Sequence, residues 1–207
     1  RWVVGGYFQR DRVRFMTDLL AADATGTNLI SNYLQKRRSA AGFAQADYRF
    51  LEDFEFSLGI RYTDDKGTYT GSTIDLNPWR TTLARASFPN VPVFFNTRAI
   101  DDNFSGRATI SYQPIEALKV YASFGKGYKA SGFDGSTIFN AFEAEAINPE
   151  DVLAYEGGFK LSLDNGVYLS ADAFYYDITD LQAFTVIPLP DGTTSPNLRI
   201  NVGKSRL

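Results

Sequence analysis

Paired carboxylates are the first groups in this sequence that could perform chemistry. Asp64 is followed by Asp65, and Asp101 by Asp102, and carboxylate oxygens are ligands that Ca²⁺ prefers. Both pairs lie in long polar stretches, which we expect to be loops with solvated charges. The sequence therefore favours solvated loop charges over a calcium site, and it predicts no metal and no cofactor.

A second candidate site is a mixture of aromatic rings and guanidinium groups within residues 64–102. Rings can stack on a ligand and guanidinium groups can pair with an anion, so an expected loop here could bind an anionic ligand such as a siderophore. The alternative, which we favour, is that the rings only pack the loop against its neighbours. The candidate ligand-binding residues are Trp79, Arg80, Arg85, Phe94, Phe95 and Arg98.

The composition excludes several classes of function. The 207 residues include no His and no Cys, which removes the usual general base, the Ser/His and Cys/His nucleophiles and the imidazole ligands. We therefore predict that the chain is not an enzyme. A formal net charge of -3 provides no basic face, so we predict no nucleic-acid partner. No stretch approaches the roughly 20 apolar residues that a membrane-spanning helix needs.

Strands must position these groups, because apolar and polar residues alternate with a period of two in several places. Between residues 54 and 62, Phe56 and Leu58 fall on one face of a strand while Glu55 falls on the other. Such a strand has one apolar and one polar face. We predict about eight strands, at residues 2–9, 36–49, 54–62, 103–112, 119–128, 152–163, 167–177 and 198–204.

The connections between these strands alternate in length. Tight turns are expected at 50–53, 113–118 and 164–166, and long loops at 10–35, 64–102 and 129–149. Within the first loop, the spacing of Phe15 and Leu19 predicts a short helix over 11–22. Short periplasmic turns opposite long extracellular loops, and strands of about ten residues, are typical of outer-membrane barrels. The sequence therefore predicts an all-β fold, an antiparallel transmembrane β-barrel segment.

The two strand faces should meet different surroundings. A Lys or Arg on the lipid face costs roughly 2 to 4 kcal/mol near the bilayer midplane, so we expect the charged face to line the lumen. The residues predicted to face the lumen are Glu55, Arg61, Arg107, Glu156 and Lys160, and those predicted to face lipid are Phe56, Leu58, Ile60, Ala108, Ile110, Phe159 and Leu161. Such charges suit a wide lumen, so we also predict that the first and last strands do not pair with each other.

Several stretches, read in order, point to one family. They are GIRYTDDK (59–66), YASFGKGYKASGF (121–133), PEDVLAYEGGFK (149–160) and FYYDITDLQ (174–182), followed by NVGKSR (201–206). Each piece alone is a weak signal, but the ordered set resembles the barrel half of TonB-dependent outer-membrane receptors. Within it, the matches to the family's patterns are Pro149, Glu150, Tyr155, Glu156, Gly158, Phe174, Tyr175, Asp180 and Gln182.

The resemblance implies a barrel of about 22 strands, of which residues 1–207 would be an internal part, with the N-terminal plug domain and the remaining strands absent. It implies the outer membrane of a Gram-negative bacterium, with membrane lipid as one partner and the TonB complex, acting through the plug, as another. The implied function is uptake of a ferric siderophore or another scarce nutrient. Two alternatives stay open, namely a complete small eight-stranded structural or adhesive barrel and a soluble carbohydrate-binding β-sandwich.

Overall fold

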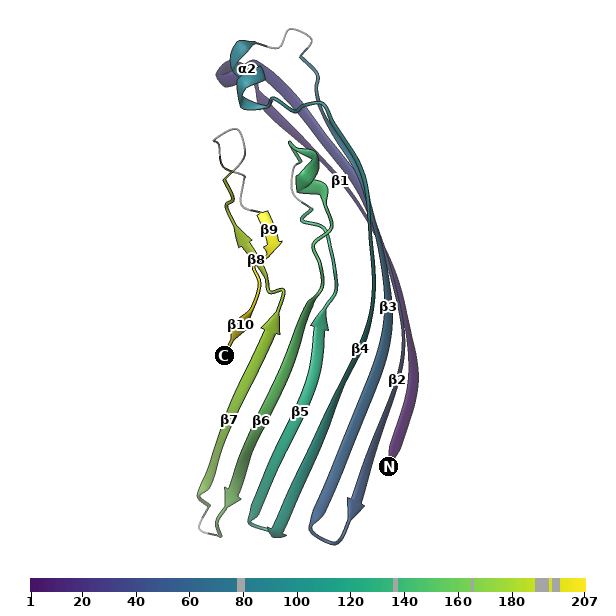
Figure 1. The fold of residues 1–207 in the computed structure, drawn as a ribbon, viewed down its shortest axis with the longest axis vertical. Helices are drawn as coiled ribbons and strands as arrows, with labels where there is room; N and C mark the ends of the chain where they lie inside the picture. Colours follow the sequence, from purple (N-terminus) through teal and green to yellow (C-terminus); the bar gives the residue numbers. More distant parts are fainter. Residues whose placement is uncertain (78–80, 136–137, 165, 189–193, 195–197) are drawn as a thin grey trace.

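One curved antiparallel sheet dominates the computed structural model, which describes residues 1–77, 81–135, 138–164, 166–188, 194 and 198–207 (Figure 1). Its eight strands follow one another in chain order. They are β1 (Trp2–Ala21), β2 (Thr27–Phe50), β3 (Phe54–Asp75), β4 (Val93–Ile115), β5 (Leu118–Lys129), β6 (Glu150–Ser162), β7 (Tyr168–Thr179) and β10 (Ser205–Arg206). No helix within the described ranges is long and apolar enough to cross a membrane.

The sheet is open at both edges. Among the described residues, β1 pairs only with β2, and β10 pairs only with β7. This confirms the prediction that the first and last strands do not pair. The predicted tight turns at 50–53 and 113–118 are confirmed as the short connections from β2 to β3 and from β4 to β5, the second narrowing to residues 116–117. The predicted turn at 164–166 falls between β6 and β7, and its residue 165 lies outside the described residues.

The predicted loop at 10–35 is wrong, and so is the predicted helix at 11–22. Residues of β1 pair continuously with β2 from Trp2 opposite Ala46 to Ala21 opposite Thr27, and only the four-residue helix α1 (Ala22–Thr25) joins the two strands. Phe15 and Leu19 are four positions apart, which is a multiple of two. Their spacing therefore fits one face of a strand as well as one face of a helix.

The predicted loop at 64–102 is mostly strand as well. β3 continues to Asp75 and β4 begins at Val93, so the connection shrinks to residues 76–92 and contains the helix α2 (Thr82–Ser87). Both faces of β3 are polar in much of this extension, as in Lys66 beside Gly67 and Thr70 beside Gly71. The alternation that reveals a strand at 54–62 is therefore missing here.

The last predicted strand, 198–204, divides in the structure. Residues Leu198–Asn201 form β9, which pairs with β8 (Gln182–Thr185) in a separate two-stranded sheet. The chain then turns at Gly203, where φ is +94°, and the main sheet ends on β10. Lys129 ends β5, and the other described residues of the predicted connection 129–149 lie outside the main sheet and include the short 3₁₀ helix η1 (Ala141–Ala144).

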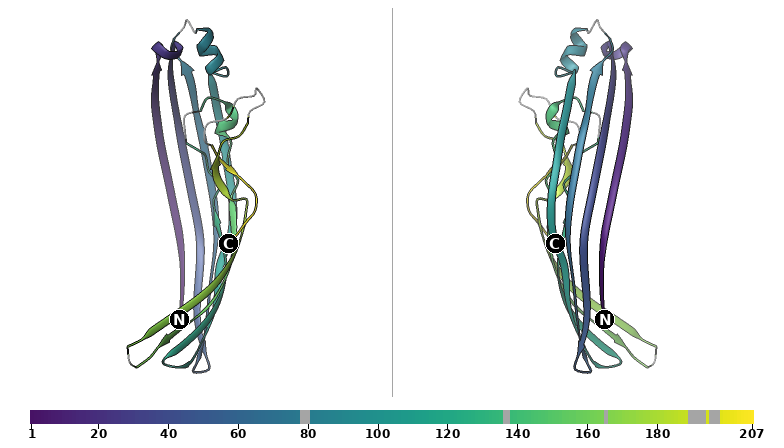
Figure 2. Two further views of the ribbon diagram at one scale, coloured as in Figure 1. Left: turned by 90° about the vertical axis from the view of Figure 1, so that its left-hand side faces the viewer. Right: turned by 90° about the vertical axis from the view of Figure 1, so that its right-hand side faces the viewer.

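Strand register assigns the side chains to two faces of the sheet. Glu55 lies opposite Ser111, Arg107 opposite Gly125, and Ser123 opposite Glu156, and directly opposite residues point to the same face. We call this side the loop-covered face, because residues 130–135 and 138–149, which we call the folded segment, lie against it (Figures 1 and 2). It carries Glu55, Arg61, Arg107, Glu156 and Lys160.

The opposite side is the apolar face. Its aromatic side chains stack across the turn end of the sheet, where the Phe54 ring lies 5.4 Å from Phe50 and 4.4 Å from Tyr112. Aromatic rings favour the level of the lipid headgroups. The register places on this face Phe56, Leu58, Ile60, Ala108, Ile110, Phe159 and Leu161.

The pairing between β4 and β5 stops well before β4 does. It reaches only Gly106 opposite Lys126, whereas β4 remains paired with β3 as far as Val93. Past this point β5 and β6 pair with each other up to Lys129 opposite Glu150. The sheet is therefore continuous at its turn end and divided between β4 and β5 towards α2.

Gly71 leaves room for two neighbouring aromatic side chains on the loop-covered face. It lies opposite both Tyr33 and Phe95, and a Cβ at this position would stand 2.6 Å from Phe95 Cζ and 2.3 Å from the Asn32 carbonyl oxygen. We expect Gly71→Ala to lower the free energy of unfolding by about 1 to 3 kcal/mol through overpacking. Denaturant unfolding in detergent would measure this, with Gly42→Ala as the control, because a Cβ at Gly42 meets nothing within 4 Å. Equal effects of the two changes would contradict the packing assigned here.

Candidate functional site

Side chains of the sheet hold the folded segment, residues 130–135 and 138–149, against the loop-covered face. Arg37 Nη2 donates to the Ser131 carbonyl oxygen at 3.2 Å, and the Ser131 amide donates to Asp101 Oδ2 at 2.7 Å. The Tyr33 hydroxyl donates to the Gly135 carbonyl oxygen at 2.7 Å. These bonds start from strands β2 and β4, so a rigid sheet fixes the position of the segment.

An aromatic cluster lies beneath this segment. Tyr69 lies at its centre and is 0% exposed. Its ring centroid lies 5.1 Å from Phe133 in a stacked pair, 4.8 Å from Phe95 and 4.9 Å from Tyr33. Phe133 belongs to the folded segment and the other rings belong to the sheet, so the cluster joins the two.

A polar groove of about 310 Å³ opens beside the segment on the same face. Its walls carry both signs of charge, and Tyr128 of β5 donates its hydroxyl to Asp65 Oδ2 at 2.8 Å. Arg61 donates through Nε to Thr63 at 3.0 Å and lies over the Tyr7 ring at 5.1 Å. The residues that line the groove are Tyr7, Gln9, Asp11, Arg37, Ser39, Arg61, Thr63, Asp65 and Tyr128.

This groove can recognise an oxygen-rich anionic molecule. Two guanidinium groups, Arg37 and Arg61, offer several N–H donors in a planar arrangement that matches carboxylate and phosphate oxygens. The phenol groups of Tyr7 and Tyr128 add polar edges on aromatic surfaces. Asp11, which lies directly opposite Arg37 in the register, and Asp65 also line the groove, so a ligand would meet both signs of charge.

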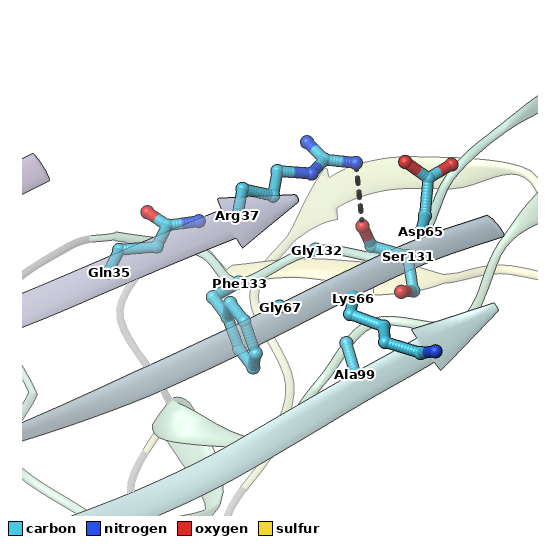
Figure 3. Close-up of a pocket in the computed structure, with 9 residues that line it drawn as sticks. All are labelled: Gln35, Arg37, Asp65, Lys66, Gly67, Ala99, Ser131, Gly132 and Phe133. Carbon is cyan, nitrogen blue, oxygen red and sulfur yellow. Dashed lines mark hydrogen bonds between the residues drawn. The ribbon is translucent and has the colours of Figure 1, made fainter. Parts of the chain in front are cut away.

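A second cavity, of about 10 Å³, lies deeper between the segment and the sheet. Figure 3 shows Arg37 reaching Ser131 across it, with Asp65 nearby and Lys66 pointing away from both. This volume holds at most a single water molecule. We therefore assign it to the packing of the segment and not to ligand binding.

An ion pair lies lower on the loop-covered face. Arg107 Nη2 lies 3.1 Å from Glu156 Oε2 and donates to Ser123 Oγ at 3.0 Å, while the Tyr121 hydroxyl donates to Glu156 Oε1 at 3.1 Å. The Arg107 side chain is 60% exposed. A pair this accessible adds little stability on its own.

The structure does not bring the predicted ligand-binding residues together. Arg85 is exposed on α2, Arg98 is exposed on the apolar face, and the neighbours Phe94 and Phe95 point to opposite faces of β4. Phe95 belongs to the buried cluster around Tyr69. Trp79 and Arg80 lie outside the described residues. The placement of Phe94, Phe95 and Arg98 in a loop is wrong, since all three belong to β4.

The acidic pairs are also separated by the strands. Asp64 and Asp65 are consecutive in β3, and Asp101 and Asp102 are consecutive in β4, so each pair divides between the two faces. Asp65 and Asp101 accept hydrogen bonds that hold the neighbouring segment. The prediction of solvated loop charges is therefore wrong for these two residues. No group of three or more His, Asp or Glu side chains within the described ranges could hold a metal ion.

Sequence reasoning missed Arg37, Asp65 and Tyr128 as groove residues. Asp65 lies four positions after Arg61, so a continued strand would have placed both on one face. The pairing of Arg37 with a segment that lies 94 positions away has no local signal in the sequence.

Hydrogen bonds also join the β8–β9 pair to the folded segment. Gln182 Nε2 donates to the carbonyl oxygens of Ala130 and Asn148, at 3.2 and 2.8 Å. Arg199 Nη2 donates to the Phe133 carbonyl oxygen at 2.9 Å. The segment is thus held between the sheet and the β8–β9 pair.

These features define part of the wall of a transmembrane β-barrel, with one apolar face and one polar face that carries a folded loop. A family model described as "TonB dependent receptor-like, beta-barrel" matches residues 1–207. The chain belongs to this family of TonB-dependent receptor barrels.

Solved structures of receptors share the fold. The ferric yersiniabactin uptake receptor FyuA from Yersinia pestis matches with a TM-score of 0.76 and 20% identity over 99% of this chain and 28% of its own. The ferric-catecholate import receptor Fiu from E. coli K12 matches with 0.57 and 15% identity, over 98% and 34% of the two chains. The hemophore receptor HasR from Serratia marcescens matches with 0.54 and 17% identity, over 98% and 38%. The chain thus spans only about a third of the length of these structures.

Proposed function

We propose that this chain forms part of the barrel of a receptor in the outer membrane of a Gram-negative bacterium, and that the complete receptor imports a ferric siderophore or a similar scarce nutrient. Membership of the TonB-dependent receptor family supports the transport role. The polar groove on the loop-covered face is the single structural observation that carries the ligand class.

In this proposal the loop-covered face lines the lumen and the apolar face contacts lipid. Glu55, Arg61, Arg107, Glu156 and Lys160 then lie in a wet interior, where their charges need no desolvation. The stacked rings of Phe50, Phe54 and Tyr112 then lie at the level of the periplasmic headgroups, and α1 and α2 lie at the extracellular end.

The open edges of the sheet support a larger barrel. Each unpaired backbone group costs several kcal/mol inside lipid, so β1 and β7 need further strands as neighbours. We propose a barrel of about 22 strands with a plugged lumen, in which the TonB complex acts through the plug. A small closed barrel would require β1 to pair with the last strand. A soluble sandwich would need to cover exposed side chains such as Trp2 and Phe8, which are 77% and 67% exposed.

The groove suggests which nutrient class is bound. Arg37 and Arg61 suit the oxygen-rich, anionic surface of a ferric chelate. FyuA takes up ferric yersiniabactin and Fiu imports ferric catecholates, and the ligand of this receptor would belong to the same broad class.

Uptake of radiolabelled ferric siderophores in a strain that lacks the gene tests this function. The gene should restore uptake of at least one chelate, and deletion of tonB should abolish that uptake. Arg61→Ala should weaken binding of the active chelate about tenfold, because a charge-assisted hydrogen bond contributes about 1.5 to 3 kcal/mol. Lys160→Ala is the control on the same face outside the groove. Uptake that persists without TonB, or an equal loss in the two variants, would contradict the proposal.

A further inference from the structure

A group of cations lies on the apolar face beyond the apolar side chains. Because residues 10–21 are strand, Arg10, Arg12 and Arg14 all point to the same side of β1 as Phe8. Strands β2, β3 and β4 place further cations on this side. We call this group the basic patch, and all its members are exposed: Arg10, Arg12, Arg14, Lys36, Arg38, Lys66 and Arg98.

Like charges stand directly opposite each other in the basic patch. Arg10 lies opposite Arg38, which lies opposite Lys66, and Arg12 lies opposite Lys36 in the next row. Directly opposite like charges destabilise a sheet. A bound anion would relieve this repulsion, so the arrangement favours an anionic partner.

Internal carboxylates neutralise only one side of the patch. Asp64 Oδ1 lies 3.7 Å from Arg38, and Asp64 Oδ2 lies 3.1 Å from Lys66. Arg12 and Lys36 have no ion pair within the described part of the chain. Asp102 lies on the patch side opposite Asp64 and accepts a hydrogen bond from the Tyr62 hydroxyl at 3.3 Å, whereas Asp11 and Asp65 point to the loop-covered face. The row of Arg12 and Lys36 is thus left without a neutralising carboxylate among the described residues.

The place of the patch indicates what kind of anion would reach it. Phe8 precedes Arg10 on the same side of β1, and below it the outward positions are the apolar Val4 and Trp2. A shallow groove of about 420 Å³ lies over the patch, and Phe8, Arg10, Lys36 and Lys66 contribute to its lining. A ligand here would meet fixed cations at one end and apolar surface at the other.

We propose that the basic patch binds the phosphate groups of a phosphorylated glycolipid of the outer leaflet, of the lipid A class. The acyl chains of the lipid would lie along the apolar face below Phe8. Arg side chains bind phosphate oxygens in a bidentate manner, and Lys acts as a point charge beside them. The assignment to the outer leaflet rests on the proposed function, because it uses the orientation given there.

Native mass spectrometry of the purified full-length receptor, titrated with bisphosphorylated lipid A, tests the site. Arg12→Gln/Lys36→Gln should raise the dissociation constant at least about tenfold. The matched control is Lys119→Gln/Lys160→Gln, which also removes two directly opposite cations, but from the loop-covered face, and it should leave binding unchanged. Unaltered heat-dependent gel mobility would show that each variant is folded.

Removing both phosphates from lipid A should lower its affinity for the wild-type receptor to that of the Arg12→Gln/Lys36→Gln variant, and inorganic phosphate at millimolar concentration should not compete. Equal binding of the dephosphorylated lipid, or unchanged binding in that variant, would overturn the proposal. Full competition by inorganic phosphate would also overturn it, because the site would then take a free anion. Lipid binding is measured on pure protein, so its outcome is separate from that of the uptake assay.

Discussion

Replacing Tyr69 with Ala should lower the free energy of unfolding by about 3 to 5 kcal/mol, the range for removing a large buried aromatic side chain. The ring contacts Phe133 of the folded segment as well as Phe95 and Tyr33 of the sheet. Its loss should therefore also release residues 130–149. Denaturant unfolding in detergent measures the first effect, and protease cleavage within this segment measures the second.

Tyr69→Phe is the matched control for this change. The Tyr69 hydroxyl is buried and has no hydrogen-bond partner among the described residues. An unsatisfied buried hydroxyl costs about 1 to 3 kcal/mol, so its removal should leave stability unchanged or raise it. A loss in Tyr69→Phe as large as that in Tyr69→Ala would mean that the hydroxyl, and not the ring, holds the cluster together.

A second large effect is expected from Leu58→Lys, which should cost roughly 2 to 4 kcal/mol in a lipid bilayer. Leu58 lies on the apolar face, midway between the aromatic residues Phe54 and Tyr62 of β3. A charge at this depth would meet hydrocarbon instead of water. Urea unfolding in phosphatidylcholine vesicles would measure the cost.

Ser57→Lys, one position away, provides the comparison. Ser57 donates to Asp47 Oδ1 at 2.8 Å on the loop-covered face, so an ammonium group here would find a carboxylate and water. We expect its cost to be under about 1 kcal/mol. The reverse order of the two costs would exchange the lipid and lumen faces, because a shift of one residue reverses every side chain in a strand.

The sequence predicted the sheet best where one strand face meets lipid and the other meets water. The contrast between the two faces is sharp from Phe54 to Tyr62, and the strand was placed correctly there. Beyond Tyr62 both faces are polar, so the same strand looked like a loop. The strand that contains Arg10, Arg12 and Arg14 was missed for the same reason. Polar residues on both faces of a strand remove the alternation of apolar and polar residues that identifies it.

The candidate site was harder to predict than the sheet because its residues meet only in three dimensions. Arg61 was assigned correctly to a charged strand face, but its neighbours in the groove come from β1, β2 and β5. The folded segment adds contacts such as Thr97 to Ala144, which are 47 positions apart. Local alternation identifies a face, but it carries no information about which distant segment folds onto that face.

The β4–β5 pairing ends at Gly106 and Lys126, and beyond this point the two strands are no longer joined as neighbours in the sheet. Every described hydrogen bond that crosses this line from the 93–105 part of β4 uses a β4 side chain, namely Thr97, Asp101 or Asn103. Among the described residues, no backbone hydrogen bond joins β4 to β5 there. Movement of β4 away from β5 along this line would therefore break no strand pairing, and side-chain contacts such as the stacked rings of Tyr69 and Phe133 would oppose it.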